Sequence, residues 1–477
     1  EISTGKVGIY LSYSTYLNVT NNTVKWISDG IFSIGQSNQG NHIYKSNQVN
    51  SSQSQSYVIY GTTIGNYNQS IDSSNLAEGK AVNYTFNGQN INISHNDSFG
   101  QVICGWCNNV TYDNITIIDG DGINLFYTSN STISNSDVNT SKGYGIYVYQ
   151  RSTNNTIVNN SINTTGNTGY GIYLVTDANH STLDNNYVWT NGTNGYGIYL
   201  DTRASANNLS GNTIDTRASN GYGVYLVATS SFNTLLNDTI TTSGATGHGI
   251  YLSTSSTNNT FSGMNIKTTN TGNAIYLANT NHNLTITDSI LNSSQSATKE
   301  FYIAAAIKVG IWNFTNVTRS NGDPINISWT AKANGTIYMY YYLDVNVSSG
   351  GSVLANANVS SYDNTTALAF SELTGASGLI ARKTLLKFSQ TNDSDSGDLY
   401  TWYSPYNMTV TLAGYSDYSN ASVNFTTNVW MDVGLNTSAG DTEYPTFSNY
   451  STTPANNTAY VLNAYYNFSS NVNTTNG

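Results

Sequence analysis

A five-residue phrase returns six times in the middle of the chain, as GYGIY at Gly143, Gly169 and Gly195, GYGVY at Gly221, GHGIY at Gly247 and GNAIY at Gly272. The first four steps between these phrases are 26 residues long and the last is 25. A period of about 20–50 residues is typical of solenoids, in which each repeat forms one turn of a stack. The repeat therefore decides the fold before any single motif is interpreted.

Four columns of the aligned repeats are apolar, and their first members are Ile146, Val148, Ile157 and Ile162. The first two columns are two residues apart, which is the spacing of a strand and not of a helix. Turn residues, mainly Gly, Asn, Ser and Thr, fill the positions between the columns. Each coil is therefore predicted to hold two or three short strands that pair in parallel with the next coil, which makes a parallel β-helix.

One further column of the repeat contains asparagine, at Asn160, Asn186 and Asn212. The side-chain amides could hydrogen-bond from coil to coil, or the residues could simply be exposed in turns. The sequence leaves these two interpretations open.

The composition excludes several classes of protein. Charged residues make up 9% of the 477 residues, against about 25% in ordinary soluble domains. The net charge is −11 and no basic cluster occurs, which argues against a nucleic-acid partner. No apolar run approaches the roughly 18 residues of a membrane-spanning helix, so none is predicted in this chain.

Asn-x-Ser/Thr sequons are abundant, at roughly 37 in the chain. A surface with so little charge would suit glycan as its solubilising layer, so the sequence predicts an extracellular, cell-surface protein with N-linked glycans. The candidate acceptors are Asn18, Asn21, Asn83, Asn139, Asn154, Asn163, Asn191, Asn208, Asn237, Asn258, Asn292, Asn334, Asn346, Asn364, Asn407, Asn420, Asn436 and Asn456.

The chain is predicted to be all-β and to divide into three parts. Residues 1–335 are expected to form the β-helix, with irregular N-terminal coils, regular 26-residue coils over 143–291 and a capping segment over 300–335. Longer alternating strands over 336–438 indicate a β-sandwich. Residues 439–477 have too little apolar content to fold alone. They are expected to be an incomplete immunoglobulin-like module that continues beyond Gly477, or a donor segment that pairs with another chain.

The alternating GIYL and NNTI phrases between Gly5 and Leu291 resemble the right-handed parallel β-helix repeats of pectate-lyase-like proteins and of archaeal surface proteins. Residues 342–415 resemble a carboxypeptidase-regulatory-like sandwich, and PTFSNYSTTPANNTAY resembles the opening of an immunoglobulin-like module. This order of modules implies an archaeal cell-surface protein of the S-layer-like or surface-appendage type. The resemblance concerns fold, and fold alone does not fix function.

The Gly247-His248-Gly249 motif is similar to one that polygalacturonases, which are also β-helices, carry beside paired aspartates. His248 falls in a column that other repeats fill with tyrosine. Glycoside hydrolysis needs two carboxylates about 5–9.5 Å apart, and the acidic residues of this chain do not align to supply them. We interpret His248 as a column substitution and predict no catalytic residue, so the chain is not expected to be an enzyme.

Asp201 and Arg203 follow a predicted strand, and the same DTRAS motif recurs at 215–219. An Asp–Arg lattice on the flank of the solenoid would suit a lyase that uses a basic residue with calcium. A local salt bridge or a lateral contact is the favoured alternative.

Cys104 and Cys107 are the only cysteines, and in an exported protein a local disulfide is favoured over free buried thiols. The acidic loop 392–398 offers Asp393, Asp395 and Asp398 as weak calcium candidates, with a solvated loop as the favoured alternative. No other metal site or cofactor is predicted.

In the strand predicted at 171–175, Ile172 and Leu174 are expected to point inward, so Tyr173 must point outward. The equivalent residues form a ladder of exposed rings at Tyr147, Tyr173, Tyr199, Tyr225, Tyr251 and Tyr276. A continuous aromatic strip favours a contact surface, and tyrosines stacked for stability alone are the alternative.

The function expected from these features is structural: a glycosylated surface protein that self-assembles into a layer, sheath or filament, with itself as the principal partner. An adhesin that binds surface polysaccharide through the tyrosine ladder is the alternative. A polysaccharide lyase or hydrolase is the least favoured hypothesis, because the paired carboxylates are missing.

Overall fold

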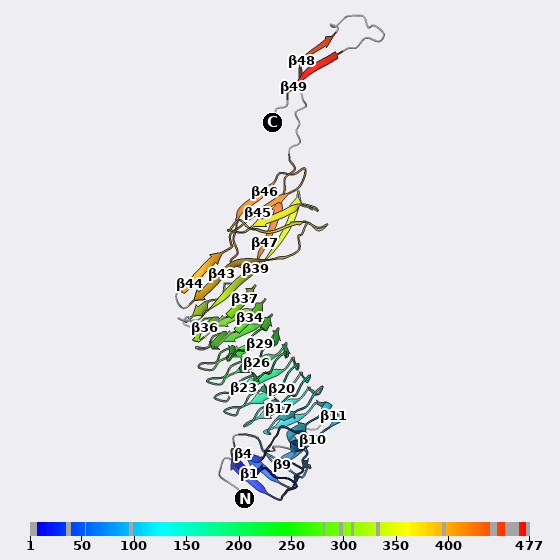
Figure 1. Ribbon diagram of the computed structural model, residues 1–477, viewed down its shortest axis with the longest axis vertical. Coiled ribbons are helices and arrows are strands. Elements are labelled where there is room, and N and C mark those ends of the chain that lie inside the picture. The colour runs from blue at the N-terminus through cyan, green and yellow to red at the C-terminus, as the bar shows by residue number, and fades with distance from the viewer. Residues whose placement is uncertain are drawn as a thin grey trace. The chain divides into compact units, whose positions relative to one another are not determined.

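The computed structural model describes residues 7–34, 40–52, 54–94, 99–279, 282–294, 299–306, 310–330, 334–393, 397–438, 446–453 and 467–473. They fall into two compact units (Figure 1). The first unit comprises Glu1–Leu343, Lys383–Pro405 and Asn424–Val429, and the second comprises Asp344–Arg382, Tyr406–Val423 and Trp430–Gly477. Among the described residues, no helix is both long and apolar enough to cross a membrane.

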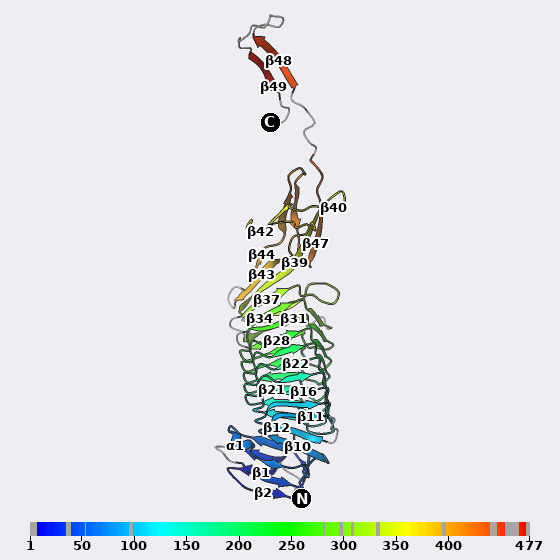
Figure 2. The ribbon, with the colours of Figure 1, turned by 90° about the vertical axis from the view of Figure 1, so that its right-hand side faces the viewer.

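The first unit is a β-helix in which each regular coil contributes one strand to each of three sheets (Figure 2). Sheet 1 runs in the order β3 (Thr23–Ile27), β6 (Gln48–Ser51), β9 (Leu76–Ala77), β10 (Lys80–Phe86), β12 (Phe99–Gly105), β15 (Ile123–Phe126), β18 (Ile146–Tyr149), β21 (Ile172–Val175), β24 (Ile198–Asp201), β27 (Val224–Leu226), β30 (Ile250–Leu252), β33 (Ile275–Asn279), β36 (Phe301–Ala306) and β38 (Ile327–Trp329).

Two further sheets complete each coil. Sheet 2 contains β11 (Gln89–Ser94), β13 (Asn108–Asp113), β16 (Thr132–Ser134), β19 (Thr156–Val158), β22 (Thr182–Asp184), β25 (Asn208–Ser210), β28 (Thr234–Leu236), β31 (Asn259–Ser262), β34 (His282–Thr287), β37 (Gly310–Thr315), β39 (Gly335–Ser349), β43 (Lys383–Asp393) and β44 (Gly397–Trp402). Sheet 3 contains β14 (Thr116–Ile118), β17 (Asp137–Thr140), β20 (Ser161–Thr164), β23 (Tyr187–Thr190), β26 (Thr213–Thr216), β29 (Thr239–Thr242), β32 (Asn265–Thr268) and β35 (Ile290–Ser293).

The apolar columns of the sequence form the interior of the solenoid. Strands β18 and β21 pair in parallel and in register, with Ile146 opposite Ile172 and Val148 opposite Leu174. All four side chains are 0% exposed. Each fully buried aliphatic side chain contributes roughly 1.5–3 kcal/mol, so repetition of these columns over the coils supplies a core without helices. The predicted parallel β-helix is confirmed.

The asparagine column forms a ladder of buried amides at the turn between sheets 2 and 3. Asn160 Nδ2 donates to Asn186 Oδ1 at 3.0 Å, and Asn186 Nδ2 donates to Asn212 Oδ1 at 3.0 Å. The ladder ends on Asp238, whose Oδ1 accepts from Asn212 Nδ2 at 2.9 Å. Each amide hydrogen-bonds to the next coil, so coil-to-coil bonding is the correct one of the two interpretations.

The N-terminal residues form three coils of their own. Their remaining strands are β1 (Val7–Ser12), β4 (Asp29–Ile34) and β7 (Tyr57–Tyr60) in one sheet and β2 (Asn18–Thr20), β5 (Ile43–Lys45) and β8 (Ser70–Ile71) in another, with one short helix, α1 (Ile64–Tyr67). The chain then reverses: β9 pairs antiparallel with β10 across the turn Glu78–Gly79, in which both residues have positive φ. The expected irregular coils are present, and this reversal was not predicted.

The reversal changes which side of sheet 1 is buried. One hydrophobic cluster joins Val24, Val49 and Ala77 of the N-terminal coils to Ile103 and Phe126, which point out of the main solenoid. The outer face of β12 and β15 is therefore an interior surface, because the N-terminal coils pack on it.

A capping role is predicted for residues 300–335, and the strands described in this segment, β36, β37 and β38, continue the solenoid. Strand β36 pairs with β33 and β38 pairs with β36 in sheet 1, and β37 pairs with β34 in sheet 2. Trp312 and Phe314 fill the interior at this end and are 0% exposed. Strand β39 follows and pairs antiparallel with β43.

The second unit contains a four-stranded antiparallel sheet in the order β42 (Leu368–Leu373), β41 (Asn358–Tyr362), β45 (Tyr406–Thr411) and β46 (Tyr418–Val423). The last residues of β39 pair with β40 (Ser352–Val353), and β47 (Val429–Gly434) also pairs with β39. Strands β48 (Thr446–Thr453) and β49 (Asn467–Asn473) pair with each other. The sandwich predicted over 336–438 and the module or donor segment predicted over 439–477 stay predictions.

Candidate functional site

The strands of sheet 1 carry tyrosines on their outer face. In β21, Ile172 and Leu174 are fully buried, and Tyr173 between them is half-buried. Side chains alternate along a strand, so the in-register equivalents of Tyr173 point the same way. They form the first row of rings, Tyr147, Tyr173, Tyr199, Tyr225, Tyr251, Tyr276 and Tyr302.

A second row comes from the loops that lead into sheet 1, and its direction was left open by the sequence. The ring of Tyr170 lies edge-on to that of Tyr173, with centroids 5.2 Å apart. A glycine follows because the corner is crowded: a Cβ on Gly171 would lie 2.2 Å from Val188 Cγ1 and 2.7 Å from the Gly197 carbonyl oxygen. The second row is Tyr144, Tyr170, Tyr196, Tyr222 and His248. We call the two rows together the tyrosine face.

Within each row the rings stack along the solenoid. Tyr173 and Tyr199 have centroids 4.6 Å apart and planes 6° apart, and Tyr170 and Tyr196 have centroids 5.0 Å apart and planes 7° apart. This spacing matches the step of about 4.8 Å between paired strands. Each ring therefore covers its faces with the rings of the neighbouring coils. Its edge and hydroxyl are what remains for solvent or for a partner.

At the coil that contains His248, a first-row ring stacks on a ring of the second row. Tyr251 stands at 86° to Tyr225, which precedes it in the first row. It stacks instead on Tyr222 of the second row, at 4.4 Å and 3°. An imidazole is smaller than a phenol ring, which leaves room for Tyr251 to turn. The stack then continues to Tyr276 at 4.9 Å, so the aromatic surface is unbroken.

His248 occupies the place of a tyrosine in the second row. Its Nδ1 accepts a hydrogen bond from the backbone N–H of Asn273 at 2.9 Å, and its ring lies 4.4 Å from that of Tyr276. Burial lowers the pKa of His248 to about 4, so the imidazole is neutral at pH 7.

One carboxylate lies beside the stacked rings. The hydroxyls of Tyr173 and Tyr199 both donate to Asp201 Oδ2, at 3.1 Å each. Hydrogen bonds to an ionised acceptor are stronger than neutral ones, so Asp201 fixes the orientation of two successive rings.

The two DTRAS motifs form local salt bridges. Arg203 pairs with Asp177 of the previous coil at 2.7 Å, and Arg217 pairs with Asp215 at 3.1 Å. Both arginine side chains are more than half exposed, and exposed ion pairs contribute about 0–1 kcal/mol. The structure therefore contains salt bridges at both motifs, with the preceding coil for Arg203 and within the motif for Arg217.

The N-terminal coils cover the beginning of the tyrosine face. The free backbone edge at β7 meets side chains that point out of sheet 1. Ser56 N donates to Asp121 Oδ2 at 2.8 Å, Tyr57 N donates to Gln101 Oε1 at 3.0 Å, and Gln101 Nε2 donates to the Tyr57 carbonyl oxygen at 2.9 Å. Burial raises the pKa of Asp121 to about 7. This polar seam was missed by sequence reasoning.

The seam uses the same columns as the tyrosines. Asn124 pairs in register with Tyr147, and Asp121 stands two residues before Ile123 as Tyr144 stands two residues before Ile146. Polar residues in two tyrosine columns were the signal that this part of the face has a different neighbour. For Asn124 this neighbour is Gln55 of the N-terminal coils. Gln55 Nε2 donates a hydrogen bond to Asn124 Oδ1 at 2.7 Å.

The remaining candidate residues lie apart from the tyrosine face. Cys104 and Cys107 are joined by a disulfide, and both are buried. Asp395 lies outside the described residues, and nothing is described of the side chains of Asp393 and Asp398. Within the described ranges, no group of three His, Cys, Asp or Glu side chains could hold a metal ion.

Of the candidate glycan acceptors, Asn456 lies outside the described residues. Those that are exposed are Asn18, Asn21, Asn154, Asn191, Asn208, Asn237, Asn258, Asn364, Asn407 and Asn436. Partly exposed acceptors are Asn83, Asn139, Asn163, Asn292, Asn334, Asn346 and Asn420. Glycosylation at these positions stays a prediction.

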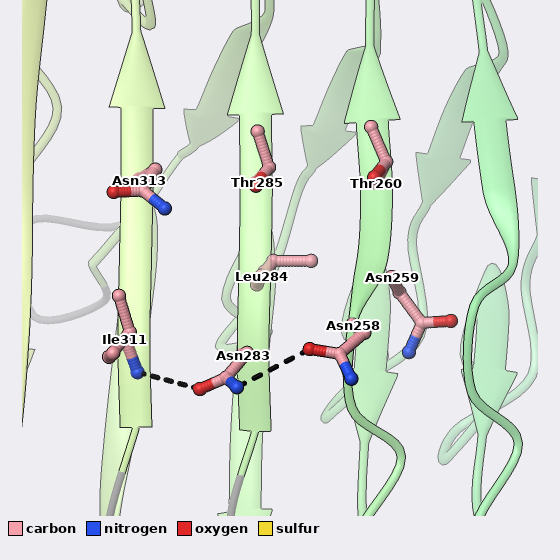
Figure 3. Close-up of a pocket in the computed structure, with 8 residues that line it drawn as sticks. All are labelled: Asn258, Asn259, Thr260, Asn283, Leu284, Thr285, Ile311 and Asn313. Atoms are coloured by element: carbon pink, nitrogen blue, oxygen red, sulfur yellow. Dashed lines mark hydrogen bonds between the residues drawn. The ribbon is translucent and has the colours of Figure 1, made fainter.

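The outer face of sheet 2 differs in kind from the tyrosine face. A shallow cavity of about 300 Å³ crosses β31, β34 and β37, and amides and hydroxyls line most of it (Figure 3). Asn283 Nδ2 donates to Asn258 Oδ1 at 3.3 Å, and the backbone N–H of Ile311 donates to Asn283 Oδ1 at 3.1 Å. No titratable side chain lines this cavity, so its residues offer hydrogen bonds and no acid–base chemistry.

Several solved structures share the fold. A variant of the tailspike protein of the E. coli bacteriophage HK620 is 9% identical, covers 86% of this chain and 81% of its own, and gives a TM-score of 0.40. The surface adhesin PfbA of Streptococcus pneumoniae is 13% identical and covers 84% of this chain and 92% of its own, with a TM-score of 0.33. A variant of the periplasmic alginate epimerase AlgG is 13% identical and covers 71% and 76%, with a TM-score of 0.36. No curated relative matches the sequence.

The missing carboxylate pair led to the prediction that the chain is not an enzyme, and that prediction is wrong. The similar structures include a periplasmic alginate epimerase, so the missing carboxylate pair does not establish that the chain is not an enzyme. At such low identity the likeness shows the fold alone, and it assigns no activity to this chain.

The family is shown by the sequence itself. The model described as "Right handed beta helix region" matches residues 7–162 and 102–266, which together span more than half of the chain. The archaeal source and the identities of the C-terminal modules stay predictions. The solenoid is right-handed, and the chain belongs to the right-handed β-helix family.

Proposed function

We propose that this chain is a glycosylated structural protein of the cell surface, which self-assembles into a layer, sheath or filament. The observation that carries the proposal is the open part of the tyrosine face, from Tyr199 to Tyr302. Its rings are half-buried and touch from coil to coil, with stacking that passes from the second row to the first between Tyr222 and Tyr251. Monomeric soluble proteins rarely leave so continuous an apolar surface uncovered, and tyrosine is enriched where proteins meet.

The support of this face is rigid. Beneath the rings, Leu200 and Leu226 are fully buried, and the strands that carry them pair in register. A rigid surface pays little conformational entropy on binding, which favours its use in repeated contacts. Stacking for stability alone accounts for the order of the rings, and it does not account for aromatic rows that repeat over successive coils on sheet 1 and not on the described strands of the other two sheets.

The test is sedimentation velocity over a range of concentrations. Replacing Tyr225 and Tyr276 together by Ser removes ring edges from the open face and keeps a hydroxyl at each position. We expect the native chain to form larger species as its concentration rises, and the variant to stay monomeric at least tenfold further up the range. The matched control is Thr234→Ala on β28 of sheet 2, which lies in no sequon and should assemble like the native chain. Native protein that remains monomeric throughout would contradict the proposal.

Binding of surface polysaccharide is the second candidate, and the ring geometry defines what it would need. Sugars commonly pack on the faces of aromatic rings, and here the faces are covered by neighbouring rings. A glycan on this surface would therefore meet ring edges and hydroxyls and would depend on hydrogen bonds. Glycan binding that is lost in the Tyr225 and Tyr276 variant while assembly persists would favour this function.

A further inference from the structure

The three outer faces of the main solenoid differ in their glycan acceptors. The strands of sheets 2 and 3 from β13 to β37 contain sequons at Asn109, Asn139, Asn163, Asn208, Asn283, Asn292 and Asn313. The strands of sheet 1 from β12 to β36 contain none. Asn191 is near this side, but it begins the loop after β23 and lies five residues before Tyr196. Glycans on the other two faces would thus leave the tyrosine face bare.

The chain already shows how this face accepts a cover. At its first rungs the N-terminal coils lie on it, with the ring of Tyr60 edge-on to that of Tyr149 at 5.5 Å and to that of Phe126 at 6.4 Å. Tyr147, beneath this cover, is 4% exposed, and its equivalent Tyr199 is half-buried. The open part of the tyrosine face is continuous with the part that the N-terminal coils already cover. The N-terminal coils contact the covered part through the edge of a tyrosine ring, that of Tyr60.

We propose that the open part of the tyrosine face pairs with the same face of a second copy of this chain, across a two-fold axis. This inference rests on the proposed function and names the partner and the face. A patch that binds a different patch builds open chains of subunits, and a patch that binds itself builds a closed pair. The pairing proposed here therefore gives a dimer as the building unit, and a layer, sheath or filament needs a further contact elsewhere on the molecule. Over the described coils, the outer faces of sheets 2 and 3 carry mostly amides, hydroxyls and glycan acceptors. Their exposed rings, Tyr187 on β23 and Tyr400 and Trp402 on β44, do not repeat from coil to coil as the tyrosine face does.

The chemistry of the face is self-complementary. A phenol hydroxyl both donates and accepts hydrogen bonds, and aromatic edges pack against aromatic edges and faces in T-shaped pairs. Burial raises the pKa of Tyr170 to about 12, so its hydroxyl keeps its proton at pH 7. A two-fold axis midway along the open rings, between Tyr225 and Tyr251, would place Tyr199 of one copy opposite Tyr276 of the other. Asp201 would then face tyrosines and not its own copy, which avoids repulsion between like charges.

Thiol crosslinking tests the pairing. The two native cysteines are bonded to each other, so a single introduced cysteine is the only reactive thiol. In full-length protein we would compare Tyr225→Cys on the tyrosine face, Thr254→Cys at its exposed rim, which keeps every tyrosine, and Thr241→Cys and Thr285→Cys on sheets 3 and 2. A short bismaleimide should convert most of the first two variants to covalent dimers and less than a tenth of the last two.

The outcomes separate this inference from the proposed function. Dimers from Tyr225→Cys or Thr254→Cys, with none from Thr241→Cys or Thr285→Cys, would support the two-fold pairing. Crosslinking only through sheets 2 or 3 would overturn the pairing while leaving self-assembly in place. No crosslinking from any variant, with native protein that sediments as a monomer, would overturn both.

Discussion

The outer face of sheet 1 exists in two forms within one molecule. Under the N-terminal coils its residues are Gln101, Asp121 and Asn124, and each is fully buried and bonded to the covering segment. Farther along, the columns of Asp121 and Asn124 hold tyrosines that no described segment covers, such as Tyr222 and Tyr225, and the column of Gln101 holds glycine. One face of one sheet thus carries polar partners where a backbone edge must be satisfied and aromatic rings where it is open.

The difference shows what each surface is built to meet. A strand edge exposes N–H and C=O groups, and burying them without partners would cost several kcal/mol, so the covered columns supply side-chain acceptors and donors. Stacked tyrosines offer no such fixed set of partners for a backbone edge. The exposed tyrosine columns are therefore suited to contacts with the side chains of a partner surface. The covered and open ends of the face are expected to respond differently to mutation and to pH.

The largest expected effect is loss of stability at the covered end. Phe126 is 1% exposed and packs against Tyr67 and Tyr147, so Phe126→Ala should lower the free energy of unfolding by about 3–5 kcal/mol. Tyr225→Ala at the open end removes a half-buried ring and should cost about 1 kcal/mol. Urea unfolding followed by tryptophan fluorescence measures both. Equal losses would mean that the two ends are buried alike.

The next effect is a pH dependence to which Asp121 contributes at the covered end. Burial raises the pKa of Asp121 to about 7 from its ordinary value of 3.8. Between these values the unfolded state loses its proton and the folded state keeps it, so stability is highest below pH 3.8 and falls as pH rises to 7. Asp121→Asn should reduce this fall and raise stability at pH 8 by roughly 2–4 kcal/mol. The remainder is expected from Asp238, since burial raises its pKa to about 7 as well. A variant with the native pH profile would show that Asp121 is not the group responsible.

A smaller and opposite pH effect is expected at the open end. The pKa of His248 is lowered to about 4 from 6.5, because burial disfavours the charged imidazole. As pH falls from 6.5 to 4, only the unfolded state gains this proton, so stability falls by about 3 kcal/mol at most. His248→Tyr should abolish this acid sensitivity, as measured by thermal unfolding at pH 7 and pH 4.5. An unchanged loss on acidification would assign it to other groups.

Much of the regular solenoid could be predicted from the sequence, because its period repeats one solution. Ile146 and Ile172 recur at strand spacing, and the outward direction of Tyr173 follows from alternation. The stacking of rows and the turn of Tyr251 beside His248 could not be predicted, since they depend on ring volumes in neighbouring coils.

The reversal between β9 and β10 was missed for a different reason. It depends on the two-residue turn Glu78–Gly79, in a region without the 26-residue period. Positive φ at both positions suits a tight hairpin, but glycine is common in this chain and one glycine carries little signal. Without the reversal, the burial of Asp121 and the division of the face into two ends could not be foreseen.

The central claim is that a second molecule covers the open tyrosines. Its most direct test is hydroxyl-radical footprinting, read by mass spectrometry, of assembled protein and of the same protein diluted until it sediments as a monomer. Tyr187 on sheet 3 is 47% exposed and serves as the internal reference. We predict that Tyr225, Tyr251 and Tyr276 are modified at least threefold more slowly in the assembled state, with Tyr187 unchanged. Equal modification of these three tyrosines in both states would contradict the claim.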